Sequence, residues 1–199
     1  MIKVICGLGN PGPRYMHTRH NLGFDIVEGL AARLVLGTET KTVRFSYRVV
    51  AADQGAVYII KPRTYVNASG AAVAEAVGMF NAAPSELFVI CDDFHLPLGA
   101  LRIRKAGSSG GHNGLESILE HLGRDDFARM RCGIGPLPDW AIMDRQKTPD
   151  FVLSRFRPEE QETVTGMISR AVEALISILD DSLDLAISRY NSVNPTPEK

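Results

Sequence analysis

Residues 2–12, IKVICGLGNPG, decide the fold of this chain. A short apolar run rich in β-branched residues, closed by glycine and proline, predicts a buried central strand. Residues 22–36 follow with apolar side chains at helical spacing, including Leu22, Ile26 and Leu30 on one face. Strand, loop and helix in this order predict an α/β fold.

The loop at residues 7–12 matches the G-x-G-x-x-G pattern of dinucleotide-binding proteins. Pro11 and Pro13 bracket Gly12, however, and proline lacks the N–H that a bound phosphate needs. The residues about 20 positions further on, where a ribose-binding acid is expected, continue the helix instead. We therefore expect no nucleotide cofactor such as a nicotinamide here, and interpret the two prolines as stiffeners that hold Asn10 at the strand end.

The remaining chain alternates strands with helices. The patterns predict a hairpin at residues 43–52 and 57–61, strands at 87–91, 101–104 and 130–134, and helices ending near Phe80, at 115–122, at 158–179 and after Ser182. We expect a single-domain three-layer α/β/α sandwich around a mixed, mostly parallel twisted sheet, spanning residues 1–193. We expect a mobile lid or cover at residues 136–149, a short strand or helical turn at residues 151–156, and a disordered tail at residues 194–199.

Composition indicates a globular protein of single-domain size. The chain has 199 residues, of which 45% are hydrophobic and 23% charged, as is ordinary for such proteins. No apolar run approaches the roughly 20 residues that span a bilayer, and the N-terminus lacks the pattern of a signal peptide. The three cysteines each close an apolar run, which is typical of buried reduced thiols, so we expect a cytoplasmic protein.

The charge balance limits the ways in which this chain can bind nucleic acid. A net charge of −1 gives no global attraction to a polyanion, so any such partner has to be held by a local patch. The chain offers six clustered basic residues: Arg102, Arg104, Lys105, Arg124, Arg129 and Arg131. They form either a phosphate-binding patch or ordinary solvated strand ends.

Polar side chains gather where four of the predicted strands end. They lie at residues 10–20, at Asn67, at residues 92–93 and at residues 112–113. Functional groups of open α/β sheets collect at the carboxyl ends of strands. A histidine oriented by a carboxylate is the unit of general-base hydrolysis, and asparagine amides can fix an amide-like substrate or an oxyanion. The set is typical of a hydrolase.

Each of these residues also has a purely structural interpretation. His20 precedes a helix and could be a cap or a satisfied polar residue, and Asn67 and Asn113 could be helix N-caps. Asp92 and Asp93 could form a turn before a proline. Residues 107–111 are either a flexible loop or a nest of backbone amides suited to a phosphate.

Taken together, the motifs resemble those of the bacterial peptidyl-tRNA hydrolase family. The similar segments are Gly7 to Gly12, Tyr15 with Thr18 to Asn21, Lys61-Pro62 through Tyr65 to Asn67 with Ser69-Gly70, Asp92-Asp93 through Leu96 to Gly99, Arg102 to Arg104, Gly110 to Leu115, and Phe127 with Arg131 to Gly135. They cover most of the chain, and their order leaves little room for coincidence.

The resemblance implies an enzyme that cleaves the ester between a peptide and the 3′-terminal ribose of tRNA, which recycles tRNA from stalled translation. By analogy His20 is the general base, Asp92 orients it, and Asn10 positions the scissile carbonyl or the water. The substrate would be bound by Tyr15, Tyr65, Asn67, Gly111, His112 and Asn113, and the tRNA phosphates by Arg102, Arg104, Lys105 and Arg131. The resemblance implies no metal and no cofactor, and we expect a monomer that binds the acceptor stem and 3′ end of peptidyl-tRNA.

The chain departs from the usual family pattern at Cys91, at Phe94-His95 and at Pro136. Two other functions stay open at this point. One is a thiol hydrolase with Cys91 as nucleophile and His20 as its base. The other is a non-catalytic RNA-binding or ribosome-binding protein of the same fold.

Overall fold

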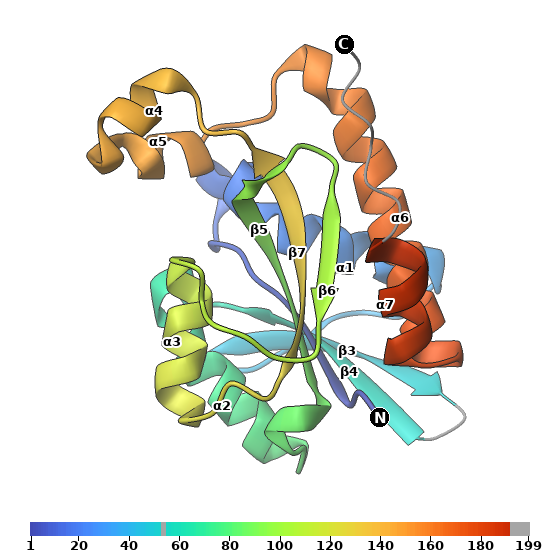
Figure 1. The fold of residues 1–199 in the computed structure, drawn as a ribbon. Helices are drawn as coiled ribbons and strands as arrows, with labels where there is room; N and C mark the ends of the chain where they lie inside the picture. Colours follow the sequence, from blue (N-terminus) through green and yellow to red (C-terminus); the bar gives the residue numbers. More distant parts are fainter. Residues whose placement is uncertain (53–54, 192–199) are drawn as a thin grey trace.

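The computed structural model describes residues 1–52 and 55–191 as an α/β fold built on a seven-stranded sheet (Figure 1). The tail predicted at residues 194–199 lies outside the described residues. In the order β2-β3-β4-β1-β5-β7-β6, the strands are β2 (Thr40–Lys41), β3 (Phe45–Ala52), β4 (Gly55–Pro62), β1 (Val4–Gly7), β5 (Leu87–Pro97), β7 (Ala128–Gly135) and β6 (Leu101–Arg104).

The sheet is mixed, as predicted, with a parallel centre. The pairs β4·β1, β1·β5 and β5·β7 are parallel, whereas the hairpin β3·β4 and the edge pair β6·β7 are antiparallel. The first strand of the chain therefore lies at the centre of the sheet, as its apolar sequence predicts. Its carboxyl end, and those of β4, β5 and β7, point to the same edge.

Helices cover both faces of the sheet (Figure 1). The longer helices are α1 (Leu22–Arg33), α2 (Ser69–Met79), α3 (Asn113–Leu122), α6 (Gln161–Asp180) and α7 (Leu183–Asn191), and two short ones, α4 (Asp139–Met143) and α5 (Thr148–Val152), follow β7. One buried cluster joins α1, α6 and α7 to the sheet, and a second joins α2 and α3 to its other face. The three-layer prediction is confirmed. Among the described residues, no helix is both long and apolar enough to cross a membrane.

The glycines of the first loop serve close packing. A Cβ added at Gly7 would lie 2.2 Å from the carbonyl oxygen of Gly23, and one at Gly9 would lie 2.8 Å from the Phe24 ring. The start of α1 therefore lies directly against the end of β1, which holds the intervening residues 10–21 at the edge of the sheet. The glycine pattern reflects this contact between strand and helix.

One strand differs from the sequence expectations. Strand β5 continues through Asp92 and Asp93 to Pro97, so these acids lie within a strand and do not follow it. The reason is that β5 pairs with β7 as far as Asp93 and again at Pro97, with an irregularity between the two. Residues 136–149 include α4 and the start of α5, and the mobile lid or cover stays a prediction. Residues 151–156 begin as the last turn of α5, and Arg155 then pairs with Thr18 in an isolated bridge.

Candidate active site

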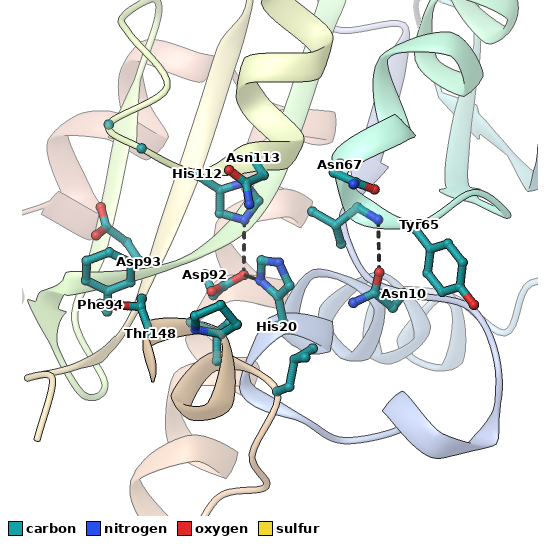
Figure 2. Close-up of a pocket in the computed structure, with 16 residues that line it drawn as sticks. Asn10, His20, Tyr65, Asn67, Asp92, Asp93, Phe94, His112, Asn113 and Thr148 are labelled. Carbon is teal, nitrogen blue, oxygen red and sulfur yellow. Dashed lines mark hydrogen bonds and ion pairs between the residues drawn. The ribbon is translucent and has the colours of Figure 1, made fainter. Parts of the chain in front are cut away.

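A cavity of about 580 Å³ lies at the carboxyl edge of the sheet (Figure 2). Every polar cluster predicted from the strand ends contributes to it. The residues predicted for the site that line it are Asn10, His20, Tyr65, Asn67, Asp92, Gly111, His112 and Asn113. Segments separated by about half the chain are thus brought together because parallel strands end at one edge. The wall opposite the sheet comes from α5 and the residue after it, through Thr148, Pro149, Val152 and Leu153.

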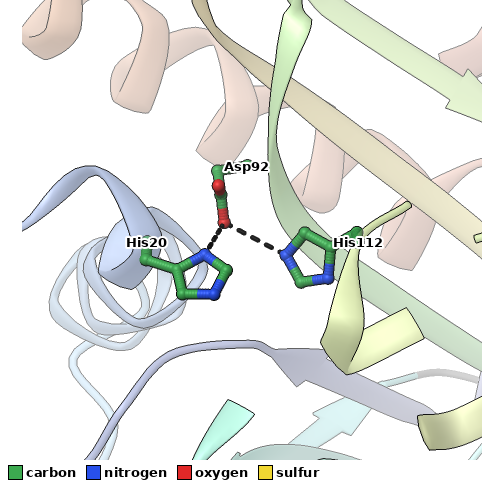
Figure 3. A group of neighbouring side chains, drawn as sticks. All are labelled: His20, Asp92 and His112. Carbon is green, nitrogen blue, oxygen red and sulfur yellow. Dashed lines mark hydrogen bonds and ion pairs between the residues drawn. The ribbon is translucent and has the colours of Figure 1, made fainter. Parts of the chain in front are cut away.

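Two histidines share one carboxylate oxygen in the floor of this cavity (Figure 3). Nδ1 of His20 lies 2.8 Å from Oδ1 of Asp92, and Nε2 of His112 lies 3.2 Å from the same atom. The two rings are 5.1 Å apart between centroids. Asp92 is 2% exposed. An ionised carboxylate only accepts hydrogen bonds, so both imidazoles donate to it.

The first turn of α3 fixes the tautomer of His112. His112 is the N-cap of this helix, and its Nδ1 accepts hydrogen bonds from the backbone N–H groups of Gly114 and Leu115, at 3.1 and 3.3 Å. The proton of the neutral ring is therefore on Nε2, where it points at Asp92. His20 in turn uses its Nδ1 proton on Asp92, which leaves the lone pair of its Nε2 free.

The electrostatics of His20 and Asp92 favour a His20 imidazole that gains a proton easily. Burial by itself lowers the pKa of His20, but the charge of Asp92 and the hydrogen bond to it raise that pKa above the ordinary value. Burial by itself raises the pKa of Asp92, but the interaction with His20 and the hydrogen bond from His112 hold it well below its usual range. Asp92 therefore stays ionised and stabilises a positive charge on His20.

His20, Asp92 and His112 also converge closely enough to be tested as metal ligands, since their ligand atoms lie within 4.8 Å of one another. The hydrogen bonds argue against that use. A metal ion on Nε2 of His112 needs the lone pair of that atom, and the ring proton would then have to move to Nδ1. That shift would break both hydrogen bonds that cap α3. The three side chains fit a proton-transfer site better than a metal site.

Asn10 is fixed in place by a residue that the sequence interpretation did not assign to the site. The backbone N–H of Asn10 donates to Oδ1 of Asn21 at 2.8 Å, and Nδ2 of Asn21 donates to the carbonyl of Asn10 at 2.9 Å. Oδ1 of Asn10 accepts from the backbone N–H of Val66 at 2.9 Å. The amide NH₂ of Asn10 is thus left to face the cavity, whose lining includes this residue. Asn21 lies in the motif next to His20, but nothing in the sequence indicated its partner.

Asn67 and Asn113 are not helix caps. Asn67 lies inside a short 3-10 turn, Val66–Ala68, and Asn113 is the first residue of α3, whose cap is His112. Both side chains are exposed at the cavity. Figure 2 shows Asn113 next to His112, and Asn67 on the side of the cavity where Asn10 and Tyr65 lie. Their amide groups are therefore available to a ligand.

The two tyrosines differ in position. Tyr65 is 59% exposed and lines the cavity. Tyr15 is not in the lining and packs edge-to-face on Tyr65, with 6.1 Å between ring centroids. We therefore interpret Tyr15 as a support for Tyr65.

The basic residues predicted to grip phosphate divide into two groups. Arg131 donates to Oδ2 of Asp93 at 3.0 Å and to the carbonyls of Ser108 and Ser109, each at 2.9 Å. These contacts support residues 107–111, which we call the glycine loop, and leave the Arg131 side chain 14% exposed. Lys105 is exposed and pairs with Asp184 of α7 at 2.6 Å.

Arg102 and Arg104 are the exposed residues of β6 and alternate with the buried Leu101 and Ile103. In the antiparallel register they lie opposite Arg131 and Arg129, so all four side chains leave the same face of the sheet. Arg129 is buried and donates to the carbonyls of Gly107, Ser108, Asp125 and Phe127. The two exposed guanidinium groups, Arg102 and Arg104, are thus the cations of this face best placed for a phosphate.

Arg19, beside His20, is a second residue that the sequence interpretation missed. Its buried guanidinium lies 4.6 and 4.7 Å from the centroids of Phe151 and Phe156. It also pairs with Glu160 at 2.6 Å, and its backbone N–H donates to the carbonyl of Ser154. The α5 wall of the cavity is therefore attached directly to the loop that carries the general-base candidate.

Cys91 does not fit the role of a nucleophile. It is fully buried in the apolar cluster beneath α2 and α3, and burial raises the pKa of its thiol far above the ordinary value. A thiol in this setting stays protonated. The structure thus supports a general-base mechanism over a thiol mechanism.

Comparisons with known proteins agree with the geometry. A family model described as peptidyl-tRNA hydrolase matches residues 4–198. A peptidyl-tRNA hydrolase of Symbiobacterium thermophilum is 40% identical over 195 residues, covering 96% of this chain and 100% of that protein. One of Elusimicrobium minutum is 40% identical over 191 residues, with 96% and 100% covered. The crystal structure of the enzyme from Acinetobacter baumannii has a TM-score of 0.89 at 30% identity, over 98% of this chain and 97% of that chain.

Proposed function

The chain belongs to the peptidyl-tRNA hydrolase family, and on this premise we propose that the hydrolase cleaves the ester between the peptide and the 3′-terminal ribose of tRNA by general-base catalysis. The observation that carries the mechanism is the hydrogen bond from Nδ1 of His20 to Asp92. It leaves Nε2 as the basic atom of the cavity. The cytoplasm, where translation takes place, is the proposed location.

The reaction begins with a water molecule in the cavity. Nε2 of His20 takes a proton from this water as its oxygen attacks the ester carbonyl. The imidazolium that forms is stabilised by the ionised Asp92, while the amide NH₂ of Asn10 is placed to donate to the carbonyl oxygen as it gains negative charge. The tetrahedral intermediate then collapses, and His20 returns the proton to the ribose oxygen. The products are a tRNA with a 3′-terminal hydroxyl and a peptide carboxylic acid, which releases the second proton of the water to solvent and becomes a carboxylate.

The remaining side chains of the cavity suit the peptide part of the substrate. Asn67 and Asn113 present amides that can donate to and accept from a peptide backbone. Tyr65 adds an exposed aromatic surface supported by Tyr15. The tRNA phosphates would contact Arg102 and Arg104, with Arg131 holding the glycine loop. We propose that the enzyme acts as a monomer.

The decisive experiment measures release of a labelled N-acetyl-aminoacyl group from tRNA. Wild-type protein is expected to release it, and His20→Ala is expected to lower turnover by about 10² to 10⁴ with little change in tRNA binding. His121→Ala is a matched control, because His121 bonds a carbonyl of its own helix and does not line the cavity. An unchanged rate in His20→Ala would refute the mechanism. Binding of tRNA without release by the wild type would favour the non-catalytic RNA-binding alternative.

A further inference from the structure

A second cavity adjoins the catalytic one on the side of the glycine loop. It has a volume of about 320 Å³ and is lined by Phe94, His95, Gly110, Gly111, Ala141 and Ile142, among others. We call it the aromatic cavity. Phe94, both glycines and Thr148 line the catalytic cavity as well. The two cavities therefore adjoin at these four residues.

Phe94 and His95 are held in place by an irregularity in the pairing of strand β5. The pairing of β5 with β7 shifts between Asp93 and Pro97. Asp93 accepts the backbone N–H of His95 on one oxygen, at 2.8 Å, and Arg131 on the other. A Cβ added at Gly135 would lie 2.1 Å from the carbonyl oxygen of Phe94. Bulges of this kind redirect side chains beside active sites, and this one presents Phe94 and His95 to the aromatic cavity.

The walls of the aromatic cavity fit a flat, uncharged heteroaromatic ring. The rings of Phe94 and His95 lie 4.4 Å apart between centroids and are inclined by 49°. Ala141 and Ile142 of α4 supply an apolar surface. Phe94 stands between Asp93 and Thr148 at the border of the two cavities (Figure 2). Nucleobases of any sequence stack on aromatic side chains in this way.

The surroundings also suit the phosphate and ribose that accompany a base. Gly110 and Gly111 have φ values of +58° and +81°, and a side chain added at Gly111 would meet no atom within 4 Å. The backbone N–H groups of Gly111 and His112 donate to Ser109 within this turn, so the turn offers a ligand an open backbone surface without side chains. The guanidinium of Arg131 lies under Gly110, within 2.8 Å of a Cβ added there. The nearby negative charge of Asp93 is paired with Arg131.

Another cavity lies on the opposite flank of the catalytic one. It has a volume of about 700 Å³, shares Asn10 with the catalytic cavity and is lined by Asp25 and Glu28 along with largely apolar residues. Asp25 is paired with His17, and Glu28 with Lys61. The neighbouring rings of Phe94 and His95 lie on the other flank, so we place the nucleoside side of the ester toward Phe94 and the acyl side toward Asn10.

We propose that the aromatic cavity binds the nucleobase of the terminal adenosine of the tRNA, stacked on Phe94 and His95. This inference rests on the proposed function, because that function puts the scissile ester on the ribose of the same nucleotide. Phe94 and His95 are departures of this chain from the usual family sequence, so the chain stacks the base with aromatic groups of its own.

The test compares two RNA minihelices that differ only in the last nucleotide, which is either adenosine or an abasic ribose; neither carries a peptide. Wild-type protein is expected to bind the abasic RNA about 5- to 160-fold more weakly, the ratio that corresponds to stacking one base. Phe94→Leu keeps an apolar side chain without the ring, and His95→Ala removes an exposed ring; both are expected to reduce this ratio toward one. Met143→Ala is the control, because Met143 lies on α4, is 87% exposed and does not line the cavity.

The outcomes separate the two proposals. A wild-type ratio near one, or an unchanged ratio in both Phe94→Leu and His95→Ala, overturns the base site while hydrolysis by wild-type protein leaves the proposed function intact. An unchanged ratio together with altered preference for peptide length in the two variants overturns it too, and assigns the cavity to the peptide. Absence of hydrolysis in the wild type overturns the proposed function itself. His95 is exposed, so its variant tests the site even if Phe94→Leu is unstable.

Discussion

Replacing Asp92 by asparagine tests the proton chemistry of the site most directly. The change keeps the size of the side chain and removes the charge that faces both His20 and His112. In the wild type, burial lowers the pKa of His20 and Asp92 more than compensates. With the charge gone, burial acts alone, and the pKa of His20 is expected to fall below its ordinary value. The asparagine amide can also present an N–H to Nδ1 of His20 and so favour the wrong tautomer.

The expected loss follows from these two effects. The imidazolium formed in the transition state loses its buried counter-charge at a distance of 2.8 Å, and part of the population has its lone pair on the wrong nitrogen. Removing general-base catalysis costs about 10² to 10⁴ in rate, which corresponds to about 3 to 5 kcal/mol of transition-state stabilisation. We expect Asp92→Asn to lie in this range.

The assay is the pH dependence of kcat/KM for release of an N-acetyl-aminoacyl group from tRNA. Its acid limb reports the pKa of the essential base in the free enzyme. For Asp92→Asn we expect a lower plateau and an acid limb displaced to lower pH, since His20 must lose its proton to act and now does so more easily. Asp126→Asn is the control, because the Asp126 side chain is 39% exposed and pairs only with Arg124 among the described residues. A plateau equal to that of the wild type, or an acid limb displaced to higher pH, would refute the reasoning.

Three further predictions concern single contacts. Asn21→Ala removes both hydrogen bonds to the backbone of Asn10. Because Asn10 is then misplaced, we expect kinetics to show a fall in kcat of roughly 10- to 100-fold, and urea denaturation to show a loss of about 1 to 3 kcal/mol in unfolding free energy. An unchanged kcat would mean that Asn21 does not support the site. Cys91→Ser places a hydroxyl in an apolar cluster, so the free energy of unfolding should fall by about 1 to 3 kcal/mol. Turnover should stay near that of the wild type, and complete loss of turnover in folded protein would favour the thiol mechanism. Arg104→Ala should weaken tRNA binding and reduce the slope of log K against log salt by about one, because one phosphate contact is lost; a slope equal to that of the wild type would mean that Arg104 does not contact phosphate.

Much of this fold can be predicted from local sequence. The strand at residues 2–8, the helix after it and the hairpin follow from periodicity and from glycine and proline at the boundaries. The gathering of Asn10, His20 and His112 follows from one general rule, that parallel strands present their carboxyl ends at the same edge. Strand β2, with only Thr40 and Lys41, is too short to carry a period and was missed.

What local sequence could not supply are the partners of buried polar groups. Asp92 and Asp93 look like turn formers, but pairing with β7 keeps them in the strand, and Arg131 neutralises Asp93 from 38 residues away. Arg19 forms an ion pair with Glu160, 141 residues further along the chain, and no short sequence motif indicates such a partner. The N-cap of α3 is His112 and not the neighbouring Asn113, because Nδ1 of the imidazole accepts hydrogen bonds from two backbone amides at once.

The cap of α3 has a consequence for the route of the proton. The lone pair of His112 is committed to the helix backbone, and the ring protons of His112 and His20 are both committed to the same oxygen of Asp92. One basic nitrogen, Nε2 of His20, is left in this group. A proton taken from water cannot cross Asp92 to the second ring unless the first turn of α3 unwinds. In the proposed mechanism it has to leave by the atom through which it entered, so attack by water and departure of the ribose oxygen would take place on the same side of the His20 ring.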